Sequence, residues 1–162
     1  MLPILKKPVP VSDRCRTRYP IVLVHGVGHR DSKVMGYWGR IPHALAKEGA
    51  TVFHGNQDAW STIQKSAEAL KKRVLEILKQ TGAEKVNLIT HSKGGLDARY
   101  MITHCGMASK VASLTTICTP HRGSVVIDKI ATLSEPYFLV YGVIMDQISK
   151  LFGDENPDFY SA

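Results

Sequence analysis

Lys85-Val-Asn-Leu-Ile-Thr-His-Ser-Lys-Gly-Gly-Leu-Asp-Ala-Arg-Tyr100 is the most informative segment of the sequence. Residues 85–90 form an apolar, β-branched run typical of a buried strand, and residues 96–104 have the composition of a helix. Ser92 stands in the small-residue turn between them. Such a turn lifts a serine hydroxyl above the C-terminal edge of a parallel sheet and directs the positive end of the helix dipole at it. The segment therefore predicts a nucleophile at Ser92 on an α/β scaffold.

The turn differs from the G-x-S-x-G pattern at one position. Thr90 occupies the place of the first glycine, and we expect its β-branched side chain to crowd the turn. Gly94 and Gly95 are expected to let the helix pack closely without a Cβ clash. The alternative interpretation of this segment alone is a helix N-cap serine followed by glycines.

A second segment has a complementary role. The run Ile21-Val-Leu-Val24 predicts a strand buried on both faces, and it ends in His25-Gly-Val-Gly28. An oxyanion hole on such a scaffold takes one N–H from the residue after the nucleophile, here Lys93, and one from this earlier loop, here Val27. We expect His25 to shape that loop. A phosphate-binding loop is the competing interpretation, but the segment lacks both G-x-G-x-x-G and a terminal Gly-Lys-Ser/Thr.

The expected elements alternate between strand and helix along most of the chain. The longest expected helix begins at Ser61, because Ser61 and Gln64 have the spacing of a capping box. Alternation of this kind is typical of an α/β domain with a mostly parallel sheet and flanking helices. The expected ranges are 21–24, 51–54, 85–90 and 111–118 for the strands and 38–48, 61–82 and 96–104 for the helices.

The sequence divides into three expected parts. Residues 1–19, with several prolines and basic residues, predict an extended lead-in, and residues 20–123 predict a partial α/β core. Residues 124–162 predict a helical cap or lid-like segment and a truncated tail, because helix-like patterns occupy 125–133 and 137–152. No later run is typical of a strand. The core is therefore expected to stop before the strands that would carry a catalytic acid and histidine.

Composition narrows the function classes. Of 162 residues 44% are hydrophobic and 22% charged, which is typical of a soluble globular domain. The formal net charge is +7, but the basic residues are spread along the chain without a nucleic-acid-binding motif, so no nucleic-acid partner is expected. The three cysteines lack metal-ligand spacing, and neither a metal nor a cofactor is expected. No apolar run is long enough to span a bilayer, and the absence of a secretory signal pattern favours a cytoplasmic location.

A set of short motifs lies along the expected core, namely Tyr19-Pro-Ile-Val-Leu-Val-His-Gly26, Tyr37-Trp-Gly-Arg-Ile-Pro42, Lys85-Val-Asn-Leu-Ile89, His91-Ser-Lys-Gly-Gly95, Ala98-Arg-Tyr100 and Thr119-Pro-His-Arg-Gly-Ser124. Together they resemble bacterial triacylglycerol lipases of the α/β-hydrolase fold. By this resemblance Ser92 is the nucleophile, Val27 and Lys93 are the oxyanion donors, and the apolar stretch after Ser124 is the cap or lid region. The resemblance also implies a lipid ester as substrate, contact with a lipid interface, and compatibility with a secreted location.

The partners of the nucleophile are less evident. In this fold the acid and the histidine follow the serine on loops after later strands. His121, on a loop expected to open toward the site, is a weak candidate for the base, and Asp97 is a weak candidate for the group that orients it. His25 is a third weak candidate.

We predict a serine lipase or carboxylesterase that hydrolyses acyl esters through an acyl-serine intermediate. Two alternatives stay open. The first alternative is a catalytically incomplete α/β-hydrolase fragment or binding module. The second is an acyltransferase on the same scaffold.

Overall fold

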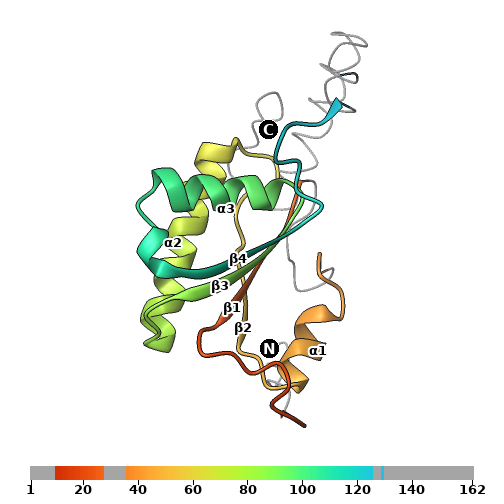
Figure 1. The fold of residues 1–162 in the computed structure, drawn as a ribbon, viewed down its shortest axis with the longest axis vertical. Coiled ribbons are helices and arrows are strands. Elements are labelled where there is room, and N and C mark those ends of the chain that lie inside the picture. Colours follow the sequence, from red (N-terminus) through yellow and green to blue (C-terminus); the bar gives the residue numbers. More distant parts are fainter. Residues whose placement is uncertain (1–9, 28–35, 126–128, 130–162) are drawn as a thin grey trace, which may run out of the picture.

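The computed structural model of the protein describes residues 10–27, 36–125 and 129 (Figure 1). Four strands form one sheet in the order β2-β1-β3-β4, and each neighbouring pair is parallel. The predicted α/β class, with a parallel sheet and flanking helices, is confirmed. The elements in chain order are β1 (Ile21–Val24), α1 (Ile41–Lys47), β2 (Val52–His54), α2 (Ile63–Thr81), β3 (Val86–His91), α3 (Lys93–His104), the short 3-10 helix η1 (Ala108–Lys110) and β4 (Val111–Ile117).

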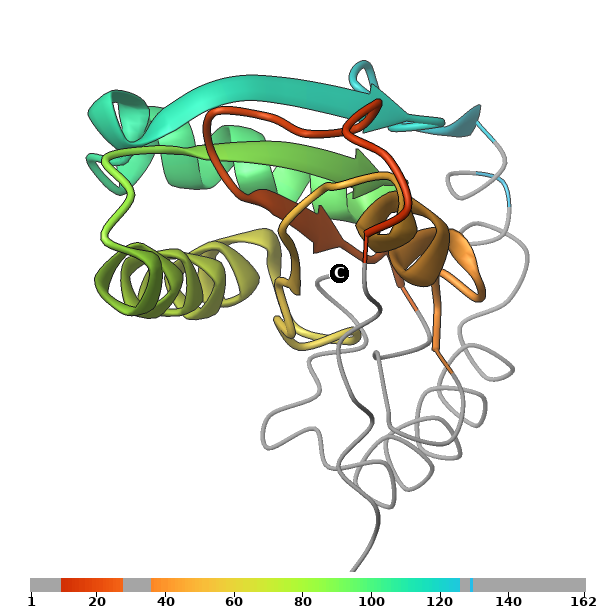
Figure 2. The ribbon, with the colours of Figure 1, turned by 90° about the horizontal axis from the view of Figure 1, so that it is seen from below.

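Helices cover both faces of the sheet, with α2 and α3 on one face and α1 on the other (Figure 1 and Figure 2). Strand β1 is central, and all four of its residues are buried. Val22 and Val24 pack into the cluster formed with α2 and α3, whereas Ile21 and Leu23 pack into a second cluster that contains Trp38. A strand with neighbours on both faces is therefore apolar at every position, as the sequence predicted.

Helix α2 confirms the periodicity read from the sequence and corrects its start. Ala67, Leu70, Val74 and Ile77, spaced by three and four, are all fully buried. The predicted capping box at Ser61 and Gln64 is wrong. The N-cap is Thr62, whose hydroxyl accepts the backbone N–H of Lys65 at 3.2 Å. The helix ends at Gly82, whose φ of 68° is left-handed and suits glycine.

The two other helices also begin at positions that differ from the prediction. Helix α1 starts at Ile41 rather than residue 38, with Pro42 in its first turn, where a missing N–H costs little. Trp38 precedes the helix and is buried in the core instead. Helix α3 starts at Lys93, directly after Ser92, rather than at residue 96.

Strand β4 is the outer strand of the sheet. Among the described residues no strand pairs with its far edge, and its side chains are exposed or half-buried. Residues 10–19 form neither helix nor strand. The helices predicted at 125–133 and 137–152, and with them the predicted cap, fall almost entirely outside the described residues. None of the helices in the described ranges is long and apolar enough to cross a membrane.

Candidate active site

Ser92 occupies a sharp turn between the end of β3 and the start of α3 at Lys93. Its φ of 52° and ψ of −128° lie in a region that L-residues rarely adopt, as in the strained turn that carries a nucleophile. The Ser92 N–H donates to the Ile117 carbonyl at 2.9 Å, so β4 supports the turn. The side chain makes no capping hydrogen bond, which excludes the interpretation of Ser92 as an ordinary N-cap.

Two glycines allow other segments to contact the first turn of α3. A Cβ built on Gly94 would lie 2.2 Å from the His25 carbonyl oxygen, and one built on Gly95 would lie 2.1 Å from Thr119 Oγ1. Both separations are far below a van der Waals contact, so each position requires glycine. The close packing expected at these glycines is therefore observed: Gly94 contacts the segment after β1, and Gly95 contacts the segment after β4.

Thr90 does not crowd the turn, contrary to the expectation from its β-branched side chain. It is fully buried, and its Oγ1 donates to the Thr115 carbonyl oxygen at 3.1 Å. The crowded position is Gly26, where a Cβ would lie 2.8 Å from Ser92 Cβ and 2.9 Å from Tyr37 Oη. The glycine that the turn requires is thus supplied by the segment after β1 rather than by position 90.

The expected oxyanion donors lie at the same edge of the sheet. Gly26 lies against Ser92, and the next residue, Val27, is 41% exposed. Lys93 is the first residue of α3, and an N–H in the first turn of a helix has no acceptor within that helix. Both backbone N–H groups therefore belong to segments that adjoin the nucleophile.

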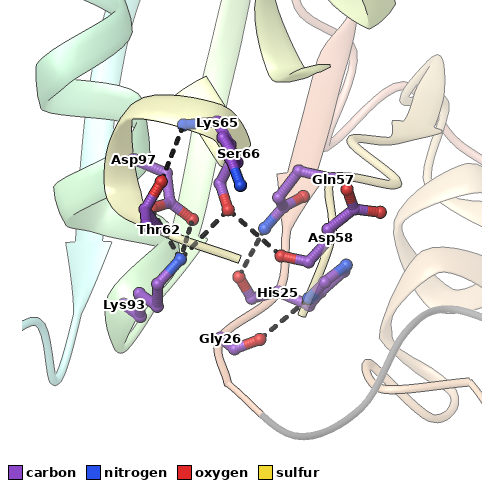
Figure 3. A network of polar contacts seen from close by, with 9 residues as sticks. All are labelled: His25, Gly26, Gln57, Asp58, Thr62, Lys65, Ser66, Lys93 and Asp97. Carbon is purple, nitrogen blue, oxygen red and sulfur yellow. Dashed lines mark hydrogen bonds and ion pairs between the residues drawn. The ribbon is translucent and has the colours of Figure 1, made fainter. Parts of the chain in front are cut away.

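The side chain of Lys93 is buried between α3 and α2 (Figure 3). Its Nζ donates to Asp97 Oδ1 at 3.1 Å, to Asp97 Oδ2 at 3.4 Å and to Ser66 Oγ at 3.1 Å. Burial raises the pKa of Asp97 to about 7, although the Lys93 charge and hydrogen bond lower it. Among the described residues Asp97 contacts no histidine. It is the counter-ion of Lys93 and does not orient a base there.

Gln57, in the segment after β2, holds the loop after β1 (Figure 3). No role was predicted for this residue from the sequence. Gln57 Nε2 donates to the His25 carbonyl oxygen at 2.7 Å, and the His25 Nδ1–H donates to the Gly26 carbonyl oxygen at 2.9 Å. Both His25 and Gln57 are buried. His25 therefore shapes the loop through its ring, and its backbone is tied to the segment after β2.

His121 has both ring nitrogens in hydrogen-bonding distance of neighbours. Arg99 Nη1 lies 2.9 Å from Nδ1, and Thr116 Oγ1 lies 3.1 Å from Nε2. Because a guanidinium can only donate, Nδ1 is the acceptor and Nε2 carries the proton. The lone pair of the ring is therefore used in accepting from Arg99. This arrangement argues against His121 as a general base for Ser92.

Tyr37 is a further site residue that the sequence analysis left unassigned. Its Oη lies 2.5 Å from Nδ1 of His91, the residue before the nucleophile, and the two ring centroids are 5.6 Å apart. The same hydroxyl limits the space at Gly26. A signal was present in the sequence, because Tyr37 and Trp38 stand in one of the motifs that carry the lipase resemblance.

The described residues contain no group of three His, Cys, Asp or Glu side chains that could hold a metal ion. They also contain no histidine hydrogen-bonded to the Ser92 hydroxyl. The described part of the chain therefore brings together Ser92, predicted to be the nucleophile, and the segments of the predicted oxyanion donors.

Comparison with known proteins shows which proteins and which fold the chain resembles. The chain is 43% identical over 113 residues to a triacylglycerol lipase of Pseudarthrobacter phenanthrenivorans, a match that covers 67% of this chain and 35% of that protein. A triacylglycerol lipase of Pseudomonas fragi is 36% identical over 121 residues, covering 74% and 41% respectively. The chain spans about a third of the length of the curated relatives it matches.

Solved structures show the same fold. A Bacillus licheniformis lipase in its propeptide form superposes with a TM-score of 0.67 at 26% identity, covering 95% of this chain and 31% of that one. A hydrolase of 2-hydroxy-6-oxo-6-phenylhexa-2,4-dienoate from Rhodococcus, at 15% identity and a TM-score of 0.53, covers 88% and 60% and shares the fold alone.

The resemblance to bacterial triacylglycerol lipases of the α/β-hydrolase fold is thus confirmed. The model of a protein family, palmitoyl protein thioesterase, matches residues 20–154, which is most of the chain and includes the Ser92 turn. The chain belongs to the palmitoyl protein thioesterase family.

Proposed function

We propose that this chain carries the nucleophile and oxyanion donors of a serine hydrolase, a lipase or carboxylesterase that acts on acyl esters with apolar chains. The observation that carries the proposal is the backbone of Ser92, which is strained at a φ of 52° between β3 and α3 and lies against Gly26. Strain of this kind persists only where the surrounding structure fixes it, and it is common at reactive residues.

The reaction follows from the placement of three groups. Ser92 Oγ attacks the ester carbonyl carbon, and the N–H groups of Lys93 and Val27 stabilise the negative charge that develops on the carbonyl oxygen. Collapse of this intermediate releases the alcohol and leaves the acyl group on Ser92. Water then attacks the acyl-serine, releases the carboxylic acid and restores the hydroxyl. We assign the acid and the base that move the protons to residues outside the described ranges.

Thioester hydrolysis is a second candidate, favoured by the match to the palmitoyl protein thioesterase family. It uses the same acyl-serine and differs only in the leaving group, a thiol instead of an alcohol. The relatives named triacylglycerol lipase favour an oxygen ester and contact with a lipid interface. An acyltransferase would differ in the acceptor of the acyl group.

A fluorophosphonate probe tests the proposed nucleophile. We expect one phosphonyl group on Ser92 by intact mass and peptide mapping, both in the 162-residue chain and in a chain extended by any coding sequence downstream of Ala162. Ser92→Ala should abolish labelling. Ser113→Ala removes an exposed serine on β4 and is the matched control, which should label like the wild type. Labelling that persists in Ser92→Ala would end the proposal.

Comparison of two substrates distinguishes the two candidates. Hydrolysis of p-nitrophenyl butyrate and of palmitoyl-coenzyme A by the extended chain measures oxygen-ester and thioester preference. A higher kcat/KM for the oxygen ester supports a lipase or carboxylesterase, and a higher value for the thioester supports the second candidate.

A further inference from the structure

A third segment contacts both parts of the site that hold the oxyanion donors. This segment, residues 55–62, connects β2 to α2 and is here called the bridging loop. From it Gln57 Nε2 donates to the His25 carbonyl oxygen at 2.7 Å. The adjacent Asp58 carbonyl oxygen accepts from Ser66 Oγ at 3.2 Å, and Ser66 Oγ accepts from Lys93 Nζ at 3.1 Å (Figure 3). Two consecutive residues thus connect the loop after β1 with the start of α3.

These hydrogen bonds act on the peptide units that matter for an oxyanion hole. The Val27 N–H and the Gly26 carbonyl belong to one planar peptide unit, so a bond to that carbonyl fixes the direction of the N–H. The His25 Nδ1–H makes that bond at 2.9 Å. Gln57 holds the preceding peptide unit through the His25 carbonyl. The direction of the Val27 donor is therefore set by two bonds, one of which comes from the bridging loop.

The Lys93 donor is held in a comparable way. Its N–H shares a peptide unit with the Ser92 carbonyl, which accepts from the Gly95 N–H at 3.1 Å. The Lys93 side chain is fixed at its far end by Asp97 and Ser66. Ser66, Lys93 and Asp97 are buried, so a side-chain bond that is lost among them would leave an unsatisfied group inside the protein.

We propose that Gln57 and Ser66 are positioning residues, which hold the Val27 and Lys93 donors at a fixed separation through the bridging loop. The inference rests on the proposed function, because the donors matter only if Ser92 is a nucleophile. Neither residue touches the reacting atoms. They act through His25 and Lys93, and their contribution lies in the geometry of the transition state rather than in substrate binding.

The test compares Gln57→Met and Ser66→Ala, which remove one hydrogen-bonding group each with little change in side-chain volume. Ile77→Val is the matched control. It removes one methyl group from the fully buried face of the same helix, α2, outside the bridging loop, and is expected to lower stability. Each variant is made in the 162-residue chain and in any extended chain. Two readouts are measured: fluorophosphonate phosphonylation, resolved into its maximal rate constant and its apparent binding constant, and hydrogen exchange of peptides that cover residues 21–27.

In Gln57→Met and Ser66→Ala we expect the maximal rate constant to fall about 10-fold or more while the binding constant changes less than about twofold, because a misplaced donor weakens only the transition state. Exchange over residues 21–27 should be faster in Gln57→Met. Ile77→Val should leave the maximal rate constant near that of the wild type.

Two results would overturn the proposal, and a third would overturn the proposed function while still testing the role of Gln57. A loss of rate in Ile77→Val as large as in the other two variants would show that general stability is responsible, and would overturn the proposal. Unchanged rates and unchanged exchange in Gln57→Met would do the same. If the wild type is not labelled at Ser92, the proposed function fails, and exchange over residues 21–27 still decides whether Gln57 holds the loop.

Discussion

At the scale of single residues, the absence of a side chain at Gly26 lets the segment after β1 lie close to Ser92. A Cβ at this position would lie 2.8 Å from Ser92 Cβ, 2.9 Å from Tyr37 Oη and 3.2 Å from the His91 carbonyl oxygen. We therefore expect Gly26→Ala to separate the loop after β1 from the turn and to reduce fluorophosphonate labelling about 10-fold or more. The measurement is the second-order labelling rate.

Gly36→Ala is the control for this variant, because among the described residues the atom nearest to a Cβ at Gly36 would be the Gly39 backbone nitrogen, 3.9 Å away. A double variant Gly26→Ala/Tyr37→Phe separates the contacts. It removes the tyrosine hydroxyl but keeps the contact with Ser92, so labelling should stay low. Normal labelling of Gly26→Ala would show that the loop adjusts without cost.

Residue identity in the nucleophile turn was predictable where chemistry restricts the choice. Ser92 and Gly94 stand in a strand-to-helix pattern that few other structures use. The expected crowding at Thr90 was wrong because the positive φ falls at Ser92 itself, while Thr90 lies in β3. Gln57 was not predictable, because a glutamine that bonds a backbone carbonyl 32 positions away leaves no local pattern.

At the scale of elements, the buried Lys93–Asp97 pair joins α3 to Ser66 on α2 and makes their packing depend on pH. The pKa of Asp97 is about 7 in the folded protein against an ordinary 3.8. Between these values the folded state binds more protons than the unfolded state. The free energy of unfolding therefore falls as pH rises through this window.

Asp97→Asn should remove this contribution while its amide oxygen still accepts from Lys93. The expected result is that the stability of the wild type relative to Asp97→Asn decreases from pH 5 to pH 8, measured by urea unfolding at each pH. Asp13→Asn, which removes an exposed carboxylate, controls for the loss of one negative charge. A difference between wild type and Asp97→Asn that does not change with pH would contradict the assignment.

Helices and strands were predicted correctly where a repeated pattern supports them, and incorrectly where a single residue determines the start of a helix. The buried face of α2 follows from residues spaced by three and four, so several positions support one conclusion. Its first residue depended on choosing between Ser61 and Thr62, both good capping residues. Gln64 favoured the wrong choice, because the actual cap bonds the backbone N–H of Lys65, which almost any residue could supply.

At the scale of the whole molecule, the described residues contain the proposed nucleophile Ser92 but no histidine bonded to its hydroxyl, and the chain spans about a third of the length of its curated relatives. We therefore expect a chain extended by downstream coding sequence to hydrolyse p-nitrophenyl butyrate with a kcat/KM on the order of 10³-fold or more above that of the 162-residue chain. Equal values for the two chains would show that a base within these 162 residues had been underestimated, with His121 the first residue to substitute.

The position of these contacts along the chain has a consequence for shortened forms of the protein. Strand β3 pairs with β1, and β4 pairs with β3. The bond from the Ser92 N–H to the Ile117 carbonyl and the contact of Gly95 with Thr119 are the described contacts of the turn that lie furthest along the chain. A chain that ends before Thr119 would therefore lack part of the support of this turn.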